Sequence, residues 1–186
     1  STNNRIMVPF YVYYSMFGFQ RIGDLAWAAG DMQARGFLLG GTSGRTTLNG
    51  EGLQHEDGHS HILANTIPNC VTYDPTFAHE VAVIMHHGMK RMVEQQENVF
   101  YYITLLNENY PMPGLTAGTE EQIIKGMYMC KPGAVPPQGT SGASEKRVQL
   151  LGSGTILRES IAAQTLLAAD WGIQADVWSC PSFNEL

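Results

Sequence analysis

Short runs of β-branched and aromatic residues alternate along this chain with segments that have helical spacing. The strand-like runs are residues 8–14, 37–41, 70–73, 98–106, 148–151 and 175–179, and the helix-like segments are residues 20–35, 77–95, 120–129 and 156–171. This alternation predicts an α/β fold with a mostly parallel sheet flanked by helices. The first run carries no charge, so we expect it to be a strand buried on both faces.

A stretch rich in Pro, Gly and Ser, residues 130–146, is typical of a linker. It predicts a first domain over residues 1–140 and the first strand–helix–strand unit of a second domain over residues 147–186. In the second part, the tripeptide Gly152–Gly154 stands between a strand and a helix. Leu157 replaces the third glycine of a dinucleotide-binding motif, so we interpret this tripeptide as a tight turn.

Composition excludes several classes of protein. The chain has 11 Lys and Arg residues against 17 Asp and Glu, a net charge of −6, which argues against a broad nucleic-acid surface. No run approaches the ~20 apolar residues of a membrane helix. Charged residues are only 15% of the chain, against roughly 25% in an average soluble domain, so we expect much of the surface to be covered within a larger protein.

The start, Ser1 to Arg5, has no initiator Met or signal pattern and is typical of an interior segment.

A long polar segment, residues 42–58, runs into the densest cluster of ionisable side chains, and such loops are often functional. The cluster contains Glu51, His55, Glu56, Asp57, His59 and His61. Imidazoles change protonation near neutral pH, and neighbouring carboxylates tune them, which favours acid–base chemistry. Two other interpretations stay open here. One is an ordinary polar surface loop, and the other is a metal-dependent hydrolase that binds zinc through His55, Asp57, His59 and His61.

Aromatic residues stand at the predicted carboxyl end of the first strand, where parallel sheets place their ligands. Tyr14 and Phe17 are suited to wall a pocket for a flat ring, with the phenol as a polar group. The alternative is that both side chains belong to the core. The three cysteines, Cys70, Cys130 and Cys180, form no Cys-x-x-Cys pair and are expected to be free thiols.

Two long strings, Pro9 to Asp24 and Gly40 to His61, closely resemble a known family. It is the thiamine-diphosphate-dependent decarboxylating subunit of the bacterial pyruvate dehydrogenase complex, in its homodimeric form. The resemblance extends along the whole chain, including Leu105–Tyr110 and Val148–Gly154. Transketolases have a similar Glu-Asp-Gly-x-x-His pattern, which Glu56 to His61 match.

The resemblance implies that this chain is a fragment of such an enzyme. Residues 1–140 would be most of a transketolase-like pyrimidine-binding domain, and residues 147–186 the start of a transketolase C-terminal-like domain. The intact enzyme would be a cytoplasmic homodimer with thiamine diphosphate at the subunit interface. It would decarboxylate pyruvate oxidatively and pass the acetyl group to the lipoyl-bearing dihydrolipoyl acetyltransferase component.

The same resemblance implies roles for individual residues. Tyr14 and Phe17 match residues that line the aminopyrimidine pocket, and Glu51 and His55 match residues near the reacting carbon, with His55 in proton transfer. His59 and His61 are further candidates, His61 through the transketolase pattern.

Some of the family's cofactor-binding residues have no match in this sequence. The Gly-Asp-Gly…Asn motif for magnesium and diphosphate is not found, so we expect Mg²⁺ to be bound by another domain and the chain alone to be inactive. A non-catalytic structural domain remains a further alternative to the enzyme.

Overall fold

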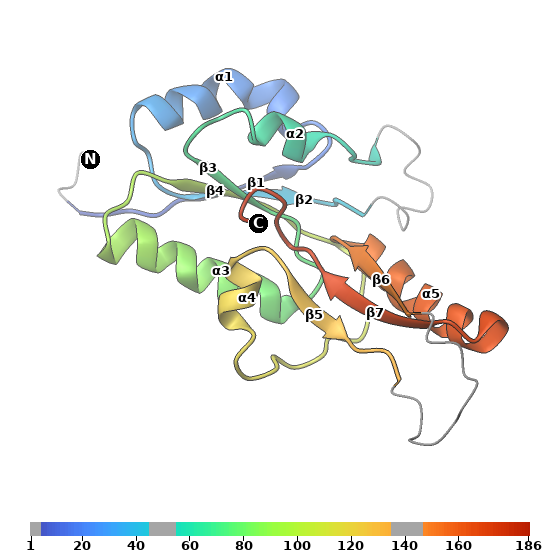
Figure 1. Cartoon of the computed structure of the whole chain (residues 1–186). Coiled ribbons are helices and arrows are strands. Elements are labelled where there is room, and N and C mark those ends of the chain that lie inside the picture. Colours follow the sequence, from blue (N-terminus) through green and yellow to red (C-terminus); the bar gives the residue numbers. More distant parts are fainter. Residues whose placement is uncertain (1–4, 45–54, 135–146) are drawn as a thin grey trace.

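The computed structural model describes residues 5–44, 55–134 and 147–186 (Figure 1). Its elements in chain order are β1 (Phe10–Tyr14), α1 (Gly18–Asp31), β2 (Phe37–Gly41), α2 (Ser60–Ala64), β3 (Cys70–Tyr73), α3 (Ala78–Met89), the π-helical turn η2 (Lys90–Glu94), β4 (Phe100–Thr104), α4 (Glu120–Ile124), β5 (Tyr128–Lys131), β6 (Arg147–Gly152), α5 (Ile156–Trp171) and β7 (Gln174–Ser179). Strands and helices alternate, and the predicted α/β class is confirmed.

The first sheet has the strand order β1-β2-β4-β3, and every pair in it is parallel. Helices α1 and α2 cover one face and α3 covers the other (Figure 1). Strand β4 shows why: its side chains alternate between the faces. Tyr102 packs with Phe19 of α1, whereas Tyr101 and Ile103 pack with Ile84 of α3. The two hydrophobic layers therefore meet at a central strand that is buried along its whole length.

The prediction that the first strand is buried on both faces is wrong for the described part of the chain. Strand β1 is at the edge of the sheet and has β2 as its one partner there. Val12 is 65% exposed and Phe10 is 54% exposed, although the Phe10 ring stacks on Phe37 at 5.0 Å between centroids. A run of apolar residues identifies a strand, but its position in the sheet determines how much of it is covered.

The second sheet has the order β5-β7-β6, with β6 and β7 parallel and β5 antiparallel to β7. Helix α5 packs on this sheet through Leu157, which is fully buried near Val177. The predicted helix over residues 120–129 is wrong in its second half. The helix ends at Ile124, Gly126 takes a left-handed conformation with φ +89°, and the strand β5 follows. A glycine in this conformation reverses the chain and stops the helix.

A buried carboxylate joins the two sheets. Glu80 of α3 has no exposed surface and accepts hydrogen bonds from the Tyr128 hydroxyl at 2.8 Å and the Ser179 hydroxyl at 2.6 Å. It also accepts the N–H of Phe77 at 2.9 Å. A buried carboxylate is costly without donors, so these bonds hold the second sheet against α3 of the first.

Candidate active site

Three predicted site residues meet at the carboxyl end of β1. The His55 ring lies 5.7 Å from the Tyr14 ring and 5.5 Å from the Phe17 ring, and both pairs are edge-to-face. Tyr14 is the last residue of β1 and Phe17 precedes α1, so the first strand–helix turn supplies both rings. Arg21 of α1 lies over the Phe17 ring at 4.9 Å. The structure thus brings together residues from the two strings that the sequence singles out. Glu51 lies outside the described residues.

Asp57 holds the start of α2 in place. Its Oδ1 accepts the N–H of Ser60 at 3.0 Å and the N–H of His59 at 3.1 Å, and its Oδ2 accepts the Ser60 hydroxyl. Burial by itself would raise the pKa of Asp57, but the hydrogen bonds from Ser60 and His59 outweigh it and hold that pKa below its ordinary value. The Tyr102 hydroxyl donates to Ser60 Oγ at 2.8 Å, which extends the network into the core.

His59 and His61 are directed to different partners. His59 Nε2 lies 3.1 Å from the Gln20 amide nitrogen, which ties it to α1. His61 Nε2 lies 3.1 Å from the Thr104 hydroxyl at the end of β4. Both residues belong to the same short segment, but His59 contacts α1 whereas His61, within α2, contacts the end of β4.

The metal hypothesis finds no support in this part of the structure. Within residues 5–44, 55–134 and 147–186, no group of three or more His, Cys, Asp and Glu side chains is placed to hold a metal ion. Asp57 is engaged by Ser60 and His59, and the two imidazoles of His59 and His61 contact different elements. Zinc needs several such groups around one point.

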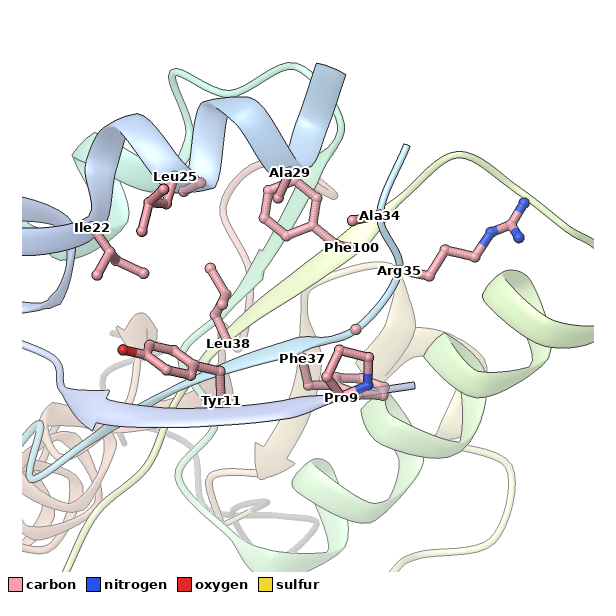
Figure 2. Close-up of a pocket in the computed structure, with 12 residues that line it drawn as sticks. Pro9, Tyr11, Ile22, Leu25, Ala29, Ala34, Arg35, Phe37, Leu38 and Phe100 are labelled. Atoms are coloured by element: carbon pink, nitrogen blue, oxygen red, sulfur yellow. The ribbon is translucent and has the colours of Figure 1, made fainter. Parts of the chain in front are cut away.

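An apolar pocket lies at the other end of the first sheet (Figure 2). Its volume is about 280 Å³, and it is lined between β1, β2 and α1 by side chains that include Tyr11, Leu25 and Phe37. Its one charged neighbour, Arg35, donates to the backbone oxygens of Gln96 and Glu97. Ligands of parallel sheets lie at the carboxyl ends of strands, whereas Phe37 begins β2, so this pocket is not the candidate active site.

Sequence reasoning missed the residues that support the histidines: Ser60, Asp74, Tyr102 and Thr104. Thr104 and Tyr102 stand in a strand that reads as ordinary core, and the short helix α2 was not predicted. Only the spatial approach of β4 to α2 shows that their hydroxyls face the histidine segment. No spacing in the sequence signals that approach.

The described chain contains no helix long and apolar enough to cross a membrane.

Burial raises the pKa of the Cys70 thiol to about 12, so this thiol is a poor nucleophile. The cysteines, all three of which lie in described segments, are free thiols as predicted.

The arrangement of sheets and helices defines the class of protein as transketolase-like α/β. A transketolase from Campylobacter jejuni superposes with a TM-score of 0.64 at 17% identity, covering 97% of this chain and 25% of that one. A transketolase mutant from Pichia stipitis gives a TM-score of 0.70 at 14% identity, covering 95% of this chain and 23% of that one. Identities this low establish the fold alone.

Two family models match the chain. The pyruvate dehydrogenase E1 component middle domain matches residues 1–113, and the transketolase-like TK C-terminal domain matches residues 126–186. The chain therefore belongs to the pyruvate dehydrogenase E1 component family.

Curated relatives named pyruvate dehydrogenase E1 component match the chain along its whole length. The protein from Escherichia coli K12 is 65% identical, that from Pseudomonas aeruginosa 64%, and that from Cupriavidus necator 61%. Each match covers 100% of this chain and 20% of the relative, so the chain spans about a fifth of their length.

Proposed function

We propose that this chain supplies one wall of a thiamine diphosphate site in the decarboxylating component of a pyruvate dehydrogenase complex. The intact enzyme decarboxylates pyruvate oxidatively and transfers the acetyl group to a lipoyl domain. The observation that carries the proposal is the cluster of Tyr14, Phe17 and His55 at the carboxyl end of β1. The cluster stands in a chain that belongs to the pyruvate dehydrogenase E1 component family.

The described residues fit one part of this cofactor. The ring centroids of Tyr14 and Phe17 lie 6.4 Å apart in an edge-to-face arrangement, which suits contact with a flat aminopyrimidine. When bound, the cofactor supplies the carbon nucleophile and the electron sink for decarboxylation. Tyr14 and Phe17 would bind and orient the ring, with Glu51, which lies outside the described residues, as a further proposed contact.

The diphosphate end of the cofactor is a different matter. Mg²⁺ prefers several carboxylate and carbonyl oxygens, and the described residues offer no cluster of three or more acidic, His or Cys side chains. We assign Mg²⁺ and the diphosphate to another domain because the family's Gly-Asp-Gly…Asn motif is not found in this sequence. A homodimer would complete the site. The proposed acceptor of the acetyl group is the lipoyl-bearing dihydrolipoyl acetyltransferase component, and the proposed location is the cytoplasm.

His55 is the proposed acid–base residue. It stands against Tyr14 and Phe17, the two rings that would hold the pyrimidine. A correctly placed acid–base group contributes typically ~10²–10⁴ in rate. Its proposed work is to orient pyruvate and to move a proton during transfer of the acetyl group.

The test is the substitution His55→Ala in the full-length protein. We expect kcat for pyruvate to fall about a hundredfold with thiamine diphosphate still bound. His86→Ala is the matched control, because His86 is exposed on α3, on the opposite face of the first sheet. A His55→Ala enzyme that keeps its turnover would remove the basis of the proposal.

We also propose that the two domains divide between residues 113 and 126. The two family models end and begin there, and β5 pairs with β7 of the second sheet. The Pro, Gly and Ser stretch near residue 140 then lies within the second domain, between β5 and β6.

A further inference from the structure

Asp74 lies where the two domains meet and is only 7% exposed. Its Oδ1 accepts the Thr104 hydroxyl at 2.5 Å, and its Oδ2 accepts the Ser153 hydroxyl at 3.0 Å. Its backbone oxygen accepts the N–H of Gly154 at 3.0 Å. Asp74, the residue that follows β3, therefore binds the end of β4 on one side and the turn before α5 on the other.

The tight turn predicted at Gly152–Gly154 is built around this carboxylate. Gly154 has φ +53°, and a Cβ at this position would lie 2.6 Å from each carboxylate oxygen of Asp74. Thr76 adds a hydrogen bond from its hydroxyl to the Gly154 oxygen at 2.6 Å. The turn is thus fitted to Asp74 by contacts that leave no room for a side chain.

The hydrogen bonds of Thr104 determine which group donates in its contact with His61. The Thr104 hydroxyl has one proton, and the Asp74 carboxylate at 2.5 Å takes it in preference to the Tyr73 oxygen at 3.4 Å. Thr104 Oγ1 must then accept at its 3.1 Å contact with His61 Nε2. His61 therefore carries a proton on Nε2 and donates it to Thr104.

The same residues face one cavity. His61, Asp74 and Ser153 line a space of about 230 Å³ between α2 and the loop that follows β7. The network therefore runs along the wall of an open volume at the carboxyl ends of the strands, where parallel sheets place their ligands.

We propose that Asp74 is a positioning residue that, through Thr104, fixes the tautomer and orientation of His61, a further candidate residue of the proposed thiamine diphosphate site. Ser153, from the second domain, holds Asp74 in turn, so the C-terminal domain sets the geometry of a histidine in the first. This inference rests on the proposed function. It assigns to the second domain a part in the reaction that its fold alone does not reveal.

The first test is a pair of substitutions in the full-length enzyme, assayed with saturating thiamine diphosphate and Mg²⁺. Thr104→Val keeps the shape of the side chain and removes the hydroxyl, and we expect kcat to fall at least about tenfold with KM for pyruvate little changed. Thr104→Ser keeps the hydroxyl and is expected to restore kcat to within about threefold of wild type. Melting temperature and bound cofactor are measured alongside, because a purely structural role would change these and leave kcat per folded enzyme unchanged.

A double-mutant cycle with His61→Ala identifies the residue through which Thr104 acts. We expect Thr104→Val to have no further effect on kcat in the His61→Ala enzyme. An equal loss in both backgrounds would overturn the proposal. Thr155→Val is the control, because the buried Thr155 hydroxyl has no hydrogen-bond partner among the described residues. If Thr104→Val does not fold, Ser153→Ala tests the network from its other end, with an expected loss of at least about threefold that also vanishes without His61.

A readout independent of activity separates this inference from the proposed function. Solid-state ¹⁵N spectra of full-length protein labelled at histidine report the protonated ring nitrogen, and the His61 signals are assigned by their loss in His61→Ala. We expect an Nε2–H tautomer in wild type that changes in Thr104→Val and persists in Thr104→Ser. An unchanged His61 signal in Thr104→Val would overturn the positioning role. If the His61 signal changes in Thr104→Val but the wild-type protein does not decarboxylate pyruvate, the positioning role stands and the proposed function is overturned.

Discussion

Asp57 lies in the histidine-rich segment that the sequence singles out, yet its carboxylate accepts hydrogen bonds from the backbone. It accepts hydrogen bonds from the N–H groups of His59 and Ser60 and from the Ser60 hydroxyl. Burial raises the pKa of the Tyr102 phenol, which therefore stays protonated and donates to Ser60. Composition predicts an ionisable cluster here, but the donors around each group decide which of them does chemistry.

Acid should weaken the protein through Asp57. Because its pKa is lowered in the folded chain, the unfolded chain binds a proton first as pH falls. The stabilisation is therefore fully present above the unfolded pKa and is lost as pH falls through the folded pKa. We expect Asp57→Asn to be less stable near neutral pH but to lose less free energy of unfolding between roughly pH 5 and pH 3. Urea unfolding at both pH values measures this.

The control for Asp57→Asn is Asp24→Asn, an exposed position on α1. It should retain the wild-type loss of stability over the same pH interval. An Asp57→Asn chain with the wild-type pH dependence would mean that the carboxylate is not held by these donors in solution.

At the scale of elements, the turn between β6 and α5 requires glycine at position 154 for two separate reasons. Gly154 needs both a left-handed backbone and empty space beside Asp74. Gly172, which ends α5 with φ +63°, needs only the backbone, because a Cβ there would meet no atom within 4 Å. Substitutions at the two glycines therefore distinguish the cost of backbone strain from the cost of steric contact.

We predict that Gly154→Ala lowers the free energy of unfolding by about 2 kcal/mol or more, since left-handed strain and overpacking add. Gly172→Ala should cost only about 1 kcal/mol, the strain alone. Chemical denaturation of the two variants measures the difference. Equal costs would show that the turn does not press against Asp74.

At the scale of the whole molecule, the proposed function makes the described chain one wall of a site. The aromatic cluster of Tyr14, Phe17 and His55 belongs to the first sheet, and the described residues provide no acidic cluster for Mg²⁺. Strand β1 also exposes apolar side chains, which agrees with the low content of charged residues.

We therefore predict that the 186-residue chain alone binds thiamine diphosphate and Mg²⁺ weakly and does not decarboxylate pyruvate. Isothermal titration calorimetry measures the binding, with the full-length protein as the positive control. Tight stoichiometric binding by the isolated chain would contradict the proposal that another domain holds the metal and the diphosphate.

Much of this architecture could be predicted from the sequence. Helix α5 runs over the predicted residues 156–171, and β2 and β3 coincide with their predicted ranges. The failures have physical causes. Helix α2 is a single short segment without a hydrophobic period, and β5 is a strand only because β7 lies beside it.

Local pattern and literal motif, then, determine on their own that this chain is α/β, that it belongs with the E1 proteins, and that Tyr14, Phe17 and His55 are the residues to examine. Only the tertiary structure decided that β1 is an exposed edge and that Asp74, Thr104 and His61 form one network. The reason is that periodicity reports the environment of neighbours along the chain. A hydrogen bond between residues far apart depends instead on how the strands and turns pack.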